Sequence, residues 1–213
     1  MKLLITAGPT REALDPMRFL SNRSTGKMGY ALAESAVENG FEVTLISGPC
    51  ALTPPEGLHA FIPVISAADM AKAVKNEFPG MDAAIMCAAV ADYRPKTFSS
   101  SKIKKSGDTL ILELEPTEDI LASLGKMKRA EQLLIGFAAE TDDMEKNALG
   151  KLQRKNLDWI AANRLDLPGQ GAESNTNTVI LFSVKGDQVK IPLSSKREVA
   201  EAILKITGIN NAR

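Results

Sequence analysis

Residues 82–105 combine an apolar run, several small side chains and a group of lysines, a combination that can bind and activate an anionic ligand. Residues 82–87 are typical of a buried strand, and Ala88 and Ala89 follow at once. Small side chains let a ligand approach the backbone, and open α/β sheets bind ligands outside the carboxyl ends of their strands. The segment therefore predicts a ligand crevice at a strand end.

A polar segment follows this strand end and carries cationic groups. Because residues 97–101 have no apolar face to bury, we expect a mobile flap over about 95–107. The flap includes Lys102, Lys104 and Lys105, whose ammonium groups can neutralise a phosphate or a developing oxyanion. A lysine run taken alone is more often part of an ordinary solvated loop.

A second arrangement suited to anions precedes a helix that we expect over residues 28–39. Ser24 and Thr25 can cap this helix, Gly26 allows close backbone approach, and Lys27 adds a positive charge. The sequence lacks both the glycine fingerprint of dinucleotide-binding folds and the hydroxyl residue that follows the lysine of a Walker loop. These residues alone leave a phosphate site and a plain capped helix as equal alternatives.

The composition excludes several classes of function. The chain has 213 residues, 44% of them hydrophobic, and its 26 basic residues balance 26 acidic ones. Zero net charge argues against nucleic acid or an anionic membrane as the main partner. The sequence shows no membrane-spanning run and no signal-peptide profile, so we expect a cytoplasmic protein. Cys50 and Cys87 show no metal spacing, and the single histidine, His59, argues against a catalytic triad or a histidine-rich metal site.

Short apolar runs alternate with amphipathic segments along the chain. Strands are predicted over residues 3–7, 42–47, 61–65, 82–87, 133–137 and 157–161, and helices over 28–39, 67–78, 118–124 and 142–155. Thr117 is the expected cap of the helix over 118–124. This alternation predicts an α/β fold with a Rossmann-like, doubly wound, mostly parallel sheet and helices on both faces. Residues 108–114 alternate with period two and predict a half-buried hairpin arm. Two further antiparallel arms are expected over 178–184 and 188–191, before a helix over 196–206, and we expect 1–213 to be a single domain.

Six segments in register resemble phosphopantothenoylcysteine synthetase over nearly the whole chain. They are TAGPTRE (6–12), SNRSTGKMG (21–29), AAVADYR (88–94), KIKK (102–105), GFAAET (136–141) and KNLDWIAAN (155–163). The closest likeness is to the bacterial, CTP-using form, often the second half of a bifunctional enzyme that also carries a flavin-dependent decarboxylase. The resemblance implies a ligase of coenzyme A biosynthesis. Such a ligase joins 4′-phosphopantothenate and L-cysteine through an acyl-cytidylate and converts CTP to CMP and pyrophosphate.

The resemblance also implies roles for individual residues. Lys102 matches the flap lysine that contacts the reacting phosphate and acyl group, and Asn22 matches the asparagine that holds the acyl-nucleotide intermediate. The implied CTP site comprises Met86, Cys87, Ala88, Asp92, Lys102, Glu118, Asp119, Ile120, Leu121, Phe137, Lys151 and Lys155. Phe137 can stack on the base, and Lys151 and Lys155 can neutralise phosphates. The expected substrate-binding residues are Arg18, Asn22, Ser24, Thr25, Gly26, Lys27 and Ala89. Among them, Arg18, Lys27 and the turn from Ser24 to Gly26 are the candidates for binding the pantothenate phosphate.

The resemblance further implies Mg²⁺ and a homodimer. In-line phosphoryl chemistry between anions needs a divalent cation, but the sequence does not identify its ligands. The family includes ATP-using members, and the decarboxylase can be fused or separate, so base choice and the full-length context stay open.

Two other classes of function are alternatives. A Rossmann-like NAD(P) oxidoreductase fits the alternating pattern, but it needs the glycine fingerprint and an acidic residue after the second strand, where this chain has Ser47 and Gly48. A non-catalytic nucleotide-binding or regulatory subunit would keep the small residues at the strand end. It would need neither Lys102 nor Asn22.

Overall fold

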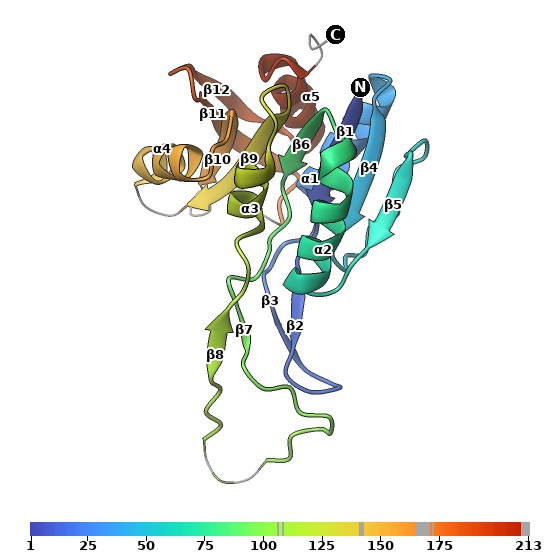
Figure 1. Cartoon of the computed structure of the whole chain (residues 1–213), viewed down its shortest axis with the longest axis vertical. Coiled ribbons are helices and arrows are strands. Elements are labelled where there is room, and N and C mark those ends of the chain that lie inside the picture. The colour runs from blue at the N-terminus through green and yellow to red at the C-terminus, as the bar shows by residue number, and fades with distance from the viewer. Residues whose placement is uncertain (106, 108, 141–142, 165–170, 172, 210–213) are drawn as a thin grey trace.

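The structure is a computed structural model that describes residues 1–105, 107, 109–140, 143–164, 171 and 173–209. Within these residues the central sheet has eight strands in the order β12-β11-β10-β9-β6-β1-β4-β5 (Figure 1). Their bounds are β1 Lys2–Ala7, β4 Glu42–Ser47, β5 Ala60–Pro63, β6 Ala83–Met86, β9 Leu133–Glu140, β10 Trp159–Arg164, β11 Thr176–Ser183 and β12 Gln188–Ser195.

The strands from β5 to β10 are parallel, and numbering them along the chain gives the order 3-2-1-4-5-6. This is the order of doubly wound dinucleotide-binding folds, in which the direction of winding reverses between the first and fourth strands. Here that reversal falls between β1 and β6. The predicted fold class is confirmed, and the crevice expected after β6 lies at the point where such folds bind ligands.

The two C-terminal arms are longer than predicted and belong to the central sheet. β11 pairs antiparallel with β10, β12 pairs antiparallel with β11, and the β11–β12 register shifts between Asn177 and Val179. A shift of this kind is a β-bulge, which bends a strand and changes where its side chains point.

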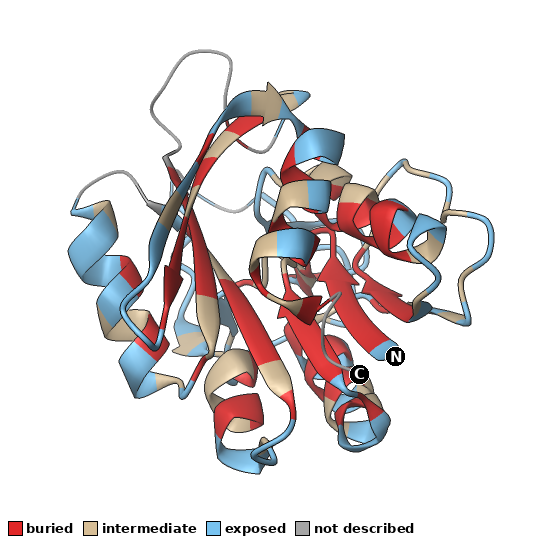
Figure 2. Cartoon of the chain, turned by 90° about the horizontal axis from the view of Figure 1, so that it is seen from above, coloured by how far each residue is buried: buried red, intermediate tan, exposed pale blue. Residues whose placement is uncertain are grey.

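Helices cover both faces of the sheet, as predicted. α1 (Lys27–Glu38) and α5 (Lys196–Ile206) pack on one face, and α2 (Ala67–Glu77), α3 (Ile120–Met127) and α4 (Met144–Arg154) pack on the other, with the short 3-10 helix η1 (Phe78–Gly80) after α2. Alternate side chains of each strand feed the two layers, so Leu3 and Ile5 join the α1/α5 core while Leu4 joins the other. Figure 2 shows the buried strands between helices whose outer faces are exposed.

The start of α1 lies directly against the end of β1. A Cβ on Gly29 would lie 2.5 Å from the Cβ of Ala7, so only glycine permits this approach. The turn after β1 is also tight, because Gly8 has φ of +71° and a Cβ there would lie 2.6 Å from the carbonyl oxygen of Gly48. These contacts fix the α1 N-terminus at the carboxyl edge of the sheet.

Two hairpins leave the carboxyl ends of β1 and β6 and form a projecting arm (Figure 1). One pairs β2 (Arg11–Ala13) with β3 (Phe19–Ser21), and the other pairs β7 (Tyr93–Pro95) with β8 (Leu114–Pro116).

The half-buried arm predicted over 108–114 is wrong. Residue 108 lies outside the described residues, 109–114 are exposed, and only Leu114 belongs to a strand. A period-two pattern buries one face only where another layer covers it, and the two-stranded β7–β8 hairpin has no such layer within the described chain.

Two predicted helix starts also differ from the structure. Thr117 does not cap α3, because its hydroxyl donates to the carbonyl of Ala91, and Asp119 caps the helix instead by accepting from the amide of Ala122. α4 begins at Met144, after Asp143; the start predicted at residue 142 lies outside the described residues.

Candidate active site

The small residues after β6 form a loop whose backbone is held by threonine side chains. The amide of Ala88 donates to Oγ1 of Thr6 at 3.1 Å, and the amide of Ala91 donates to Oγ1 of Thr10 at 3.0 Å. Both threonines are fully buried, and Thr117 supports the same loop through the carbonyl of Ala91. The sequence analysis did not identify these threonines, which make the strand end a fixed platform for a ligand.

A cavity of about 250 Å³ lies beside this platform, between the ends of β6 and β9 and the start of α3; we call it the β6–α3 cavity. It is lined by ten of the twelve residues predicted to bind the nucleotide: Met86, Ala88, Asp92, Glu118, Asp119, Ile120, Leu121, Phe137, Lys151 and Lys155. The structure thus brings together residues from four separate segments. Cys87 and Lys102 are not among the lining residues of this cavity.

Opposite charges meet at one side of the β6–α3 cavity. Nζ of Lys155 lies 3.0 Å from Oδ1 of Asp119, the residue that caps α3. Burial alone would raise the pKa of Asp119, but the hydrogen bonds from Lys155 and from the amide of Ala122 lower it overall. The Asp119 carboxylate is therefore ionised at neutral pH. Glu118 is similarly paired with Lys75 at 2.8 Å.

A second cavity of about 650 Å³ adjoins the first; we call it the β10–α5 cavity. Three residues line both cavities: Ala88, Val90 and Phe137. Four further predicted site residues line only the second: Asn22, Ser24, Cys87 and Ala89. The two cavities thus form one continuous candidate site with a shared wall.

Asn22 lies beside the shared wall. Its Nδ2 donates to the carbonyls of Ala89 at 3.0 Å and Val90 at 3.3 Å, which leaves Oδ1 as the atom that it can offer to a ligand. Burial raises the pKa of the Cys87 thiol to about 12 despite the nearby charge of Lys196. Cys87 is therefore a protonated thiol in the cavity wall and not an activated nucleophile.

Three of the predicted substrate-binding residues lie outside both cavities, at the start of α1. The helix is capped by Gly26, with φ of 79° and no capping bond from a side chain, so the predicted caps are wrong. Ser24 instead accepts from the amide of Gly26 at 3.3 Å. Lys27 donates to the carbonyl of Glu173 and to Oδ1 of Asn175, and Thr25 also lines neither cavity.

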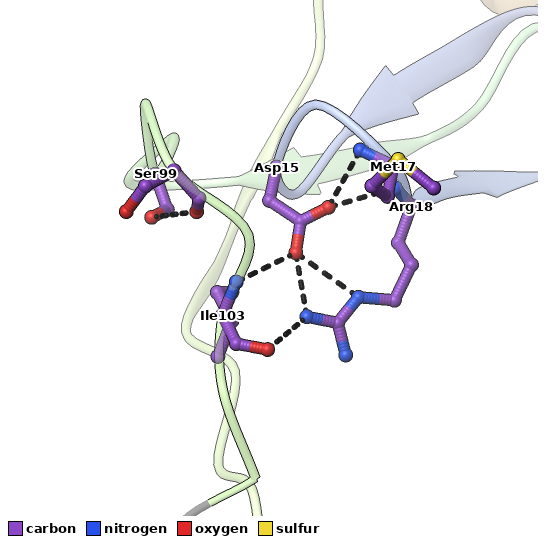
Figure 3. Close-up of polar contacts among 6 residues, drawn as sticks. Asp15, Met17, Arg18, Ser99 and Ile103 are labelled. Carbon is purple, nitrogen blue, oxygen red and sulfur yellow. Dashed lines mark hydrogen bonds and ion pairs between the residues drawn. The ribbon is translucent and has the colours of Figure 1, made fainter.

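Arg18 and Lys102 lie on the projecting arm, away from the residues that line the cavities. Figure 3 shows Arg18 bound to Asp15, with the flap held against the same carboxylate. Nη2 of Arg18 donates to the carbonyl of Ile103 at 2.7 Å, and the amide of Ile103 donates to Oδ2 of Asp15 at 3.0 Å. The Arg18 guanidinium holds the pKa of Asp15 well below its usual range. The flap is therefore docked in this structure, and Lys102 is exposed beside its anchored neighbour.

The β10–α5 cavity also holds polar residues that were not predicted from sequence: Asn163, Asn177 and Lys196. All three are buried although they are polar or charged. Lys196 is the first residue of α5, next to Ser195, which forms a capping box with Glu198. In the sequence this pattern is typical of an ordinary helix start and does not indicate a binding residue. Asn163 could have been predicted from sequence, because it follows a predicted strand and the carboxyl ends of such strands bind ligands.

The carboxylates near the β6–α3 cavity do not form a ready metal site, since Glu118 is paired with Lys75 and Asp119 with Lys155. Within the described part of the chain, no three His, Cys, Asp or Glu side chains gather into a cluster that could hold a metal ion. Mg²⁺ nevertheless fits the β6–α3 cavity, since it commonly binds through one or two carboxylates together with the phosphates of a substrate, and Asp92 lines this cavity. No helix in the described ranges is long and apolar enough to cross a membrane.

Comparison with known proteins identifies the family. The profile described as DNA/pantothenate metabolism flavoprotein C-terminal domain matches residues 1–208. Coenzyme A biosynthesis bifunctional protein CoaBC of Bacillus subtilis is 52% identical over 202 residues, which are 95% of this chain and 50% of that protein. The chain thus spans about half the length of the curated relatives it matches.

Solved structures agree with this result. The C-terminal domain of a CoaBC protein is 47% identical with a TM-score of 0.82, over 98% of this chain and 94% of that one. The DNA/pantothenate metabolism flavoprotein from Streptococcus pneumoniae is 26% identical with a TM-score of 0.83, over 98% of this chain and 99% of that one. The chain therefore belongs to the family of DNA/pantothenate metabolism flavoprotein C-terminal domains, as the six sequence motifs predicted.

Proposed function

We propose that this chain is a phosphopantothenate–cysteine ligase of coenzyme A biosynthesis, with CTP as the activating nucleotide. The observation that carries the proposal is the pair of adjoining cavities with a shared wall of Ala88, Val90 and Phe137. A reaction between a nucleotide and a second acidic substrate needs two such sites in contact. The likeness to CoaBC proteins supports this assignment.

In this proposal CTP occupies the β6–α3 cavity. The ring of Phe137 stacks on the base, while Lys151 and Lys155 approach the phosphates from the last turns of α4 and its C-cap. Mg²⁺, when bound, would neutralise the triphosphate and orient it, with Asp92 as the lining carboxylate. The choice of CTP over ATP rests on the resemblance of the GFAAET and KNLDWIAAN segments to the bacterial form.

4′-Phosphopantothenate occupies the β10–α5 cavity with its carboxylate at the shared wall. A carboxylate oxygen attacks the α-phosphorus of CTP, the bond to the bridging oxygen breaks, and pyrophosphate leaves with the acyl-cytidylate formed. The amine of cysteine then attacks the acyl carbon, CMP leaves, and the amine loses a proton to complete the amide. Asn22 orients the intermediate through its Oδ1, and Lys102 stabilises the developing charge after the flap has moved from its docked position.

We also propose that the chain is a single domain that forms a homodimer through its arm. The arm exposes large apolar side chains, among them Met17, Phe98, Leu110 and Ile111, the last 88% exposed. Apolar groups gathered on a projecting element favour a protein partner. Ile111→Asp should therefore shift the dimer to monomer in sedimentation experiments, whereas Val184→Asp, on the exposed β11–β12 turn, should not.

The cellular context is part of the same proposal. We propose a cytoplasmic enzyme, because its proposed nucleotide substrate is made in the cytoplasm. The decarboxylase that would consume its product is either fused to the same polypeptide or separate, as the length of the relatives allows.

Two alternatives have less support. The strand order also occurs in NAD(P) oxidoreductases, but the turn after β1 reads Gly8-Pro9-Thr10 without the glycine fingerprint, and β4 ends at Ser47 without an acidic residue. A regulatory nucleotide-binding subunit would have the β6–α3 cavity and no need of the second one.

The decisive experiment measures pyrophosphate release by the purified chain with Mg²⁺, 4′-phosphopantothenate and either CTP or ATP, with and without cysteine. Release that depends on phosphopantothenate and prefers CTP is expected, and cysteine should then yield the amide. Tight CTP binding without pyrophosphate release would favour the regulatory subunit. Preference for ATP would overturn only the nucleotide assignment.

A further inference from the structure

Two helices begin at the β10–α5 cavity. Met28 in the first turn of α1 and Lys196 at the start of α5 both line it. The amides of a helix N-terminus carry a partial positive charge that favours anions. α1 has neither a side-chain cap nor an acidic residue in its first turn, so this end of the helix is not already satisfied by a carboxylate.

A buried lysine lies at the same cavity. The residue Lys196 is only 6% exposed, and its Nζ donates to the carbonyl of Gly171 at 3.1 Å. Burial lowers the pKa of Lys196, and the nearby charge of Lys27 lowers it further. An ammonium in this position would gain from a bound anion, because an anion offsets both of these effects.

Asn177 provides a further observation that points to a ligand. It lines the cavity from β11, beside the point where the β11–β12 register shifts, it is 4% exposed, and its Oδ1 has no hydrogen-bond partner within the described part of the structure. A buried acceptor without a partner is costly, so a donor on a bound molecule would satisfy it. The cavity thus offers a cationic group and an amide to the same ligand.

We propose that Lys196 binds the phosphate of 4′-phosphopantothenate and that Asn177 accepts a hydrogen bond from a hydroxyl or amide donor of the same substrate. This assignment rests on the proposed function. The substrate carboxylate must lie at the shared wall, next to the nucleotide. Neither Lys196 nor Asn177 lines the β6–α3 cavity, and β11 lies three strands from β6 in the sheet, roughly 14 Å at about 4.8 Å per strand. An extended substrate with an acid group at each end fits this separation.

The assignment differs from the one predicted from sequence, which placed the phosphate at Arg18, Lys27 and the turn from Ser24 to Gly26; of these residues only Ser24 lines the β10–α5 cavity. In the structure Arg18 is bound to Asp15 on the arm, and Lys27 is bound to Glu173 and Asn175. The remaining charged residues in the lining, Arg23 and Glu173, are exposed and of opposite sign. Lys196 is therefore the buried cation of this cavity.

Calorimetric binding of 4′-phosphopantothenate and of unphosphorylated pantothenate tests the role of Lys196. For Lys196→Gln we expect a loss of roughly 10-fold to 150-fold in affinity for the phosphorylated ligand, the factor that a hydrogen bond to a charged group supports, and no change for pantothenate. Affinity for CTP should stay within about twofold. Lys205→Gln, an exposed lysine on the same helix, is the matched control and should change neither ligand.

Equal losses for both ligands would overturn the proposal, because they would mean that Lys196 only supports the chain near Gly171. Unchanged affinity for the phosphorylated ligand would overturn it as well. If Lys196→Gln fails to fold, the near-isosteric Asn177→Asp gives a second test, since its added charge should repel the phosphorylated ligand more than pantothenate. A wild-type chain that binds CTP but releases no pyrophosphate with phosphopantothenate would instead refute the proposed function, and the two failures are distinguishable.

Discussion

The pairing of Lys155 with Asp119 predicts an unusual response to removal of a negative charge from the β6–α3 cavity. Nζ of Lys155 lies 2.9 Å from Oδ2 of Asp119, and the side chains of these residues are 21% and 51% exposed. A nucleotide phosphate must compete with this carboxylate for the same ammonium. Asp119→Asn should therefore tighten CTP binding, whereas loss of a direct ligand contact would weaken it.

The magnitude follows from the exposure of the pair. Half-exposed ion pairs contribute about 0.2–1 kcal/mol because solvent screens them. Release of Lys155 from Asp119 should thus improve the dissociation constant of CTP by a factor between about 1.4 and 5. Asparagine is also a good N-cap, so the bond to the amide of Ala122 and the start of α3 should persist.

Calorimetric titration of CTP without phosphopantothenate measures this effect, at low and high salt. Glu131→Gln, which removes an exposed carboxylate paired with Arg129 outside the cavity, is the control and should leave CTP binding unchanged. Weaker binding by Asp119→Asn would refute the reasoning and assign the carboxylate a direct role with ribose or metal. Because the pKa of Asp119 is lowered, its charge is lost only as pH falls below its ordinary value of 3.8, so the pair should not alter CTP affinity between about pH 6 and 8.

Three further predictions concern the flap and the core. Lys102→Gln should reduce the rate of amide formation at least about 100-fold with little change in melting temperature, as loss of a transition-state donor predicts, and an unchanged turnover would remove Lys102 from the mechanism. Asp15→Asn removes the carboxylate that holds Ile103, so proteolytic cleavage after Lys102 should become faster while thermal unfolding changes little; equal cleavage rates would show that the flap is held by other contacts. Gly29→Val should lower stability by about 1–3 kcal/mol in urea unfolding, since its Cβ would lie 2.5 Å from that of Ala7, and wild-type stability would mean that α1 can shift away from β1.

The central sheet was predictable from sequence because its strands and turns are each indicated by residues that are neighbours along the chain. Parallel strands buried on both faces are continuous apolar runs, and the turns at Gly8 and Gly48 mark where two of them end. The helix over 196–206 was predicted with the bounds that the structure has, and the Ser195–Glu198 capping box seen in the structure fixes its start. Residues 108–114 show the opposite case, in which the pattern indicates a face but not the layer that would cover it.

The candidate site could be predicted only in part for a related reason. Ten nucleotide residues were assigned through the family resemblance, and they meet because the ends of β6, β9 and α4 lie at one edge of the sheet. Lys196 and Asn177 carry no local signal, since their direction depends on the start of α5 and on the shifted register of β11 against β12, which come together only in the folded chain. Thr117 was assigned to the wrong partner because a hydroxyl before a helix can bind any nearby carbonyl or amide.

The docked flap explains why Lys102, the proposed catalytic lysine, lines neither cavity. Asp15 binds Met17, Arg18 and Ile103 together, so five hydrogen bonds to one buried carboxylate fix the flap and the β2–β3 turn as a unit. Lys102 can reach the shared wall only if this unit opens or if the arm of a second copy supplies the residue. The two routes differ in concentration dependence: opening within one chain gives a specific activity independent of protein concentration, whereas supply by a partner makes it rise as the dimer forms.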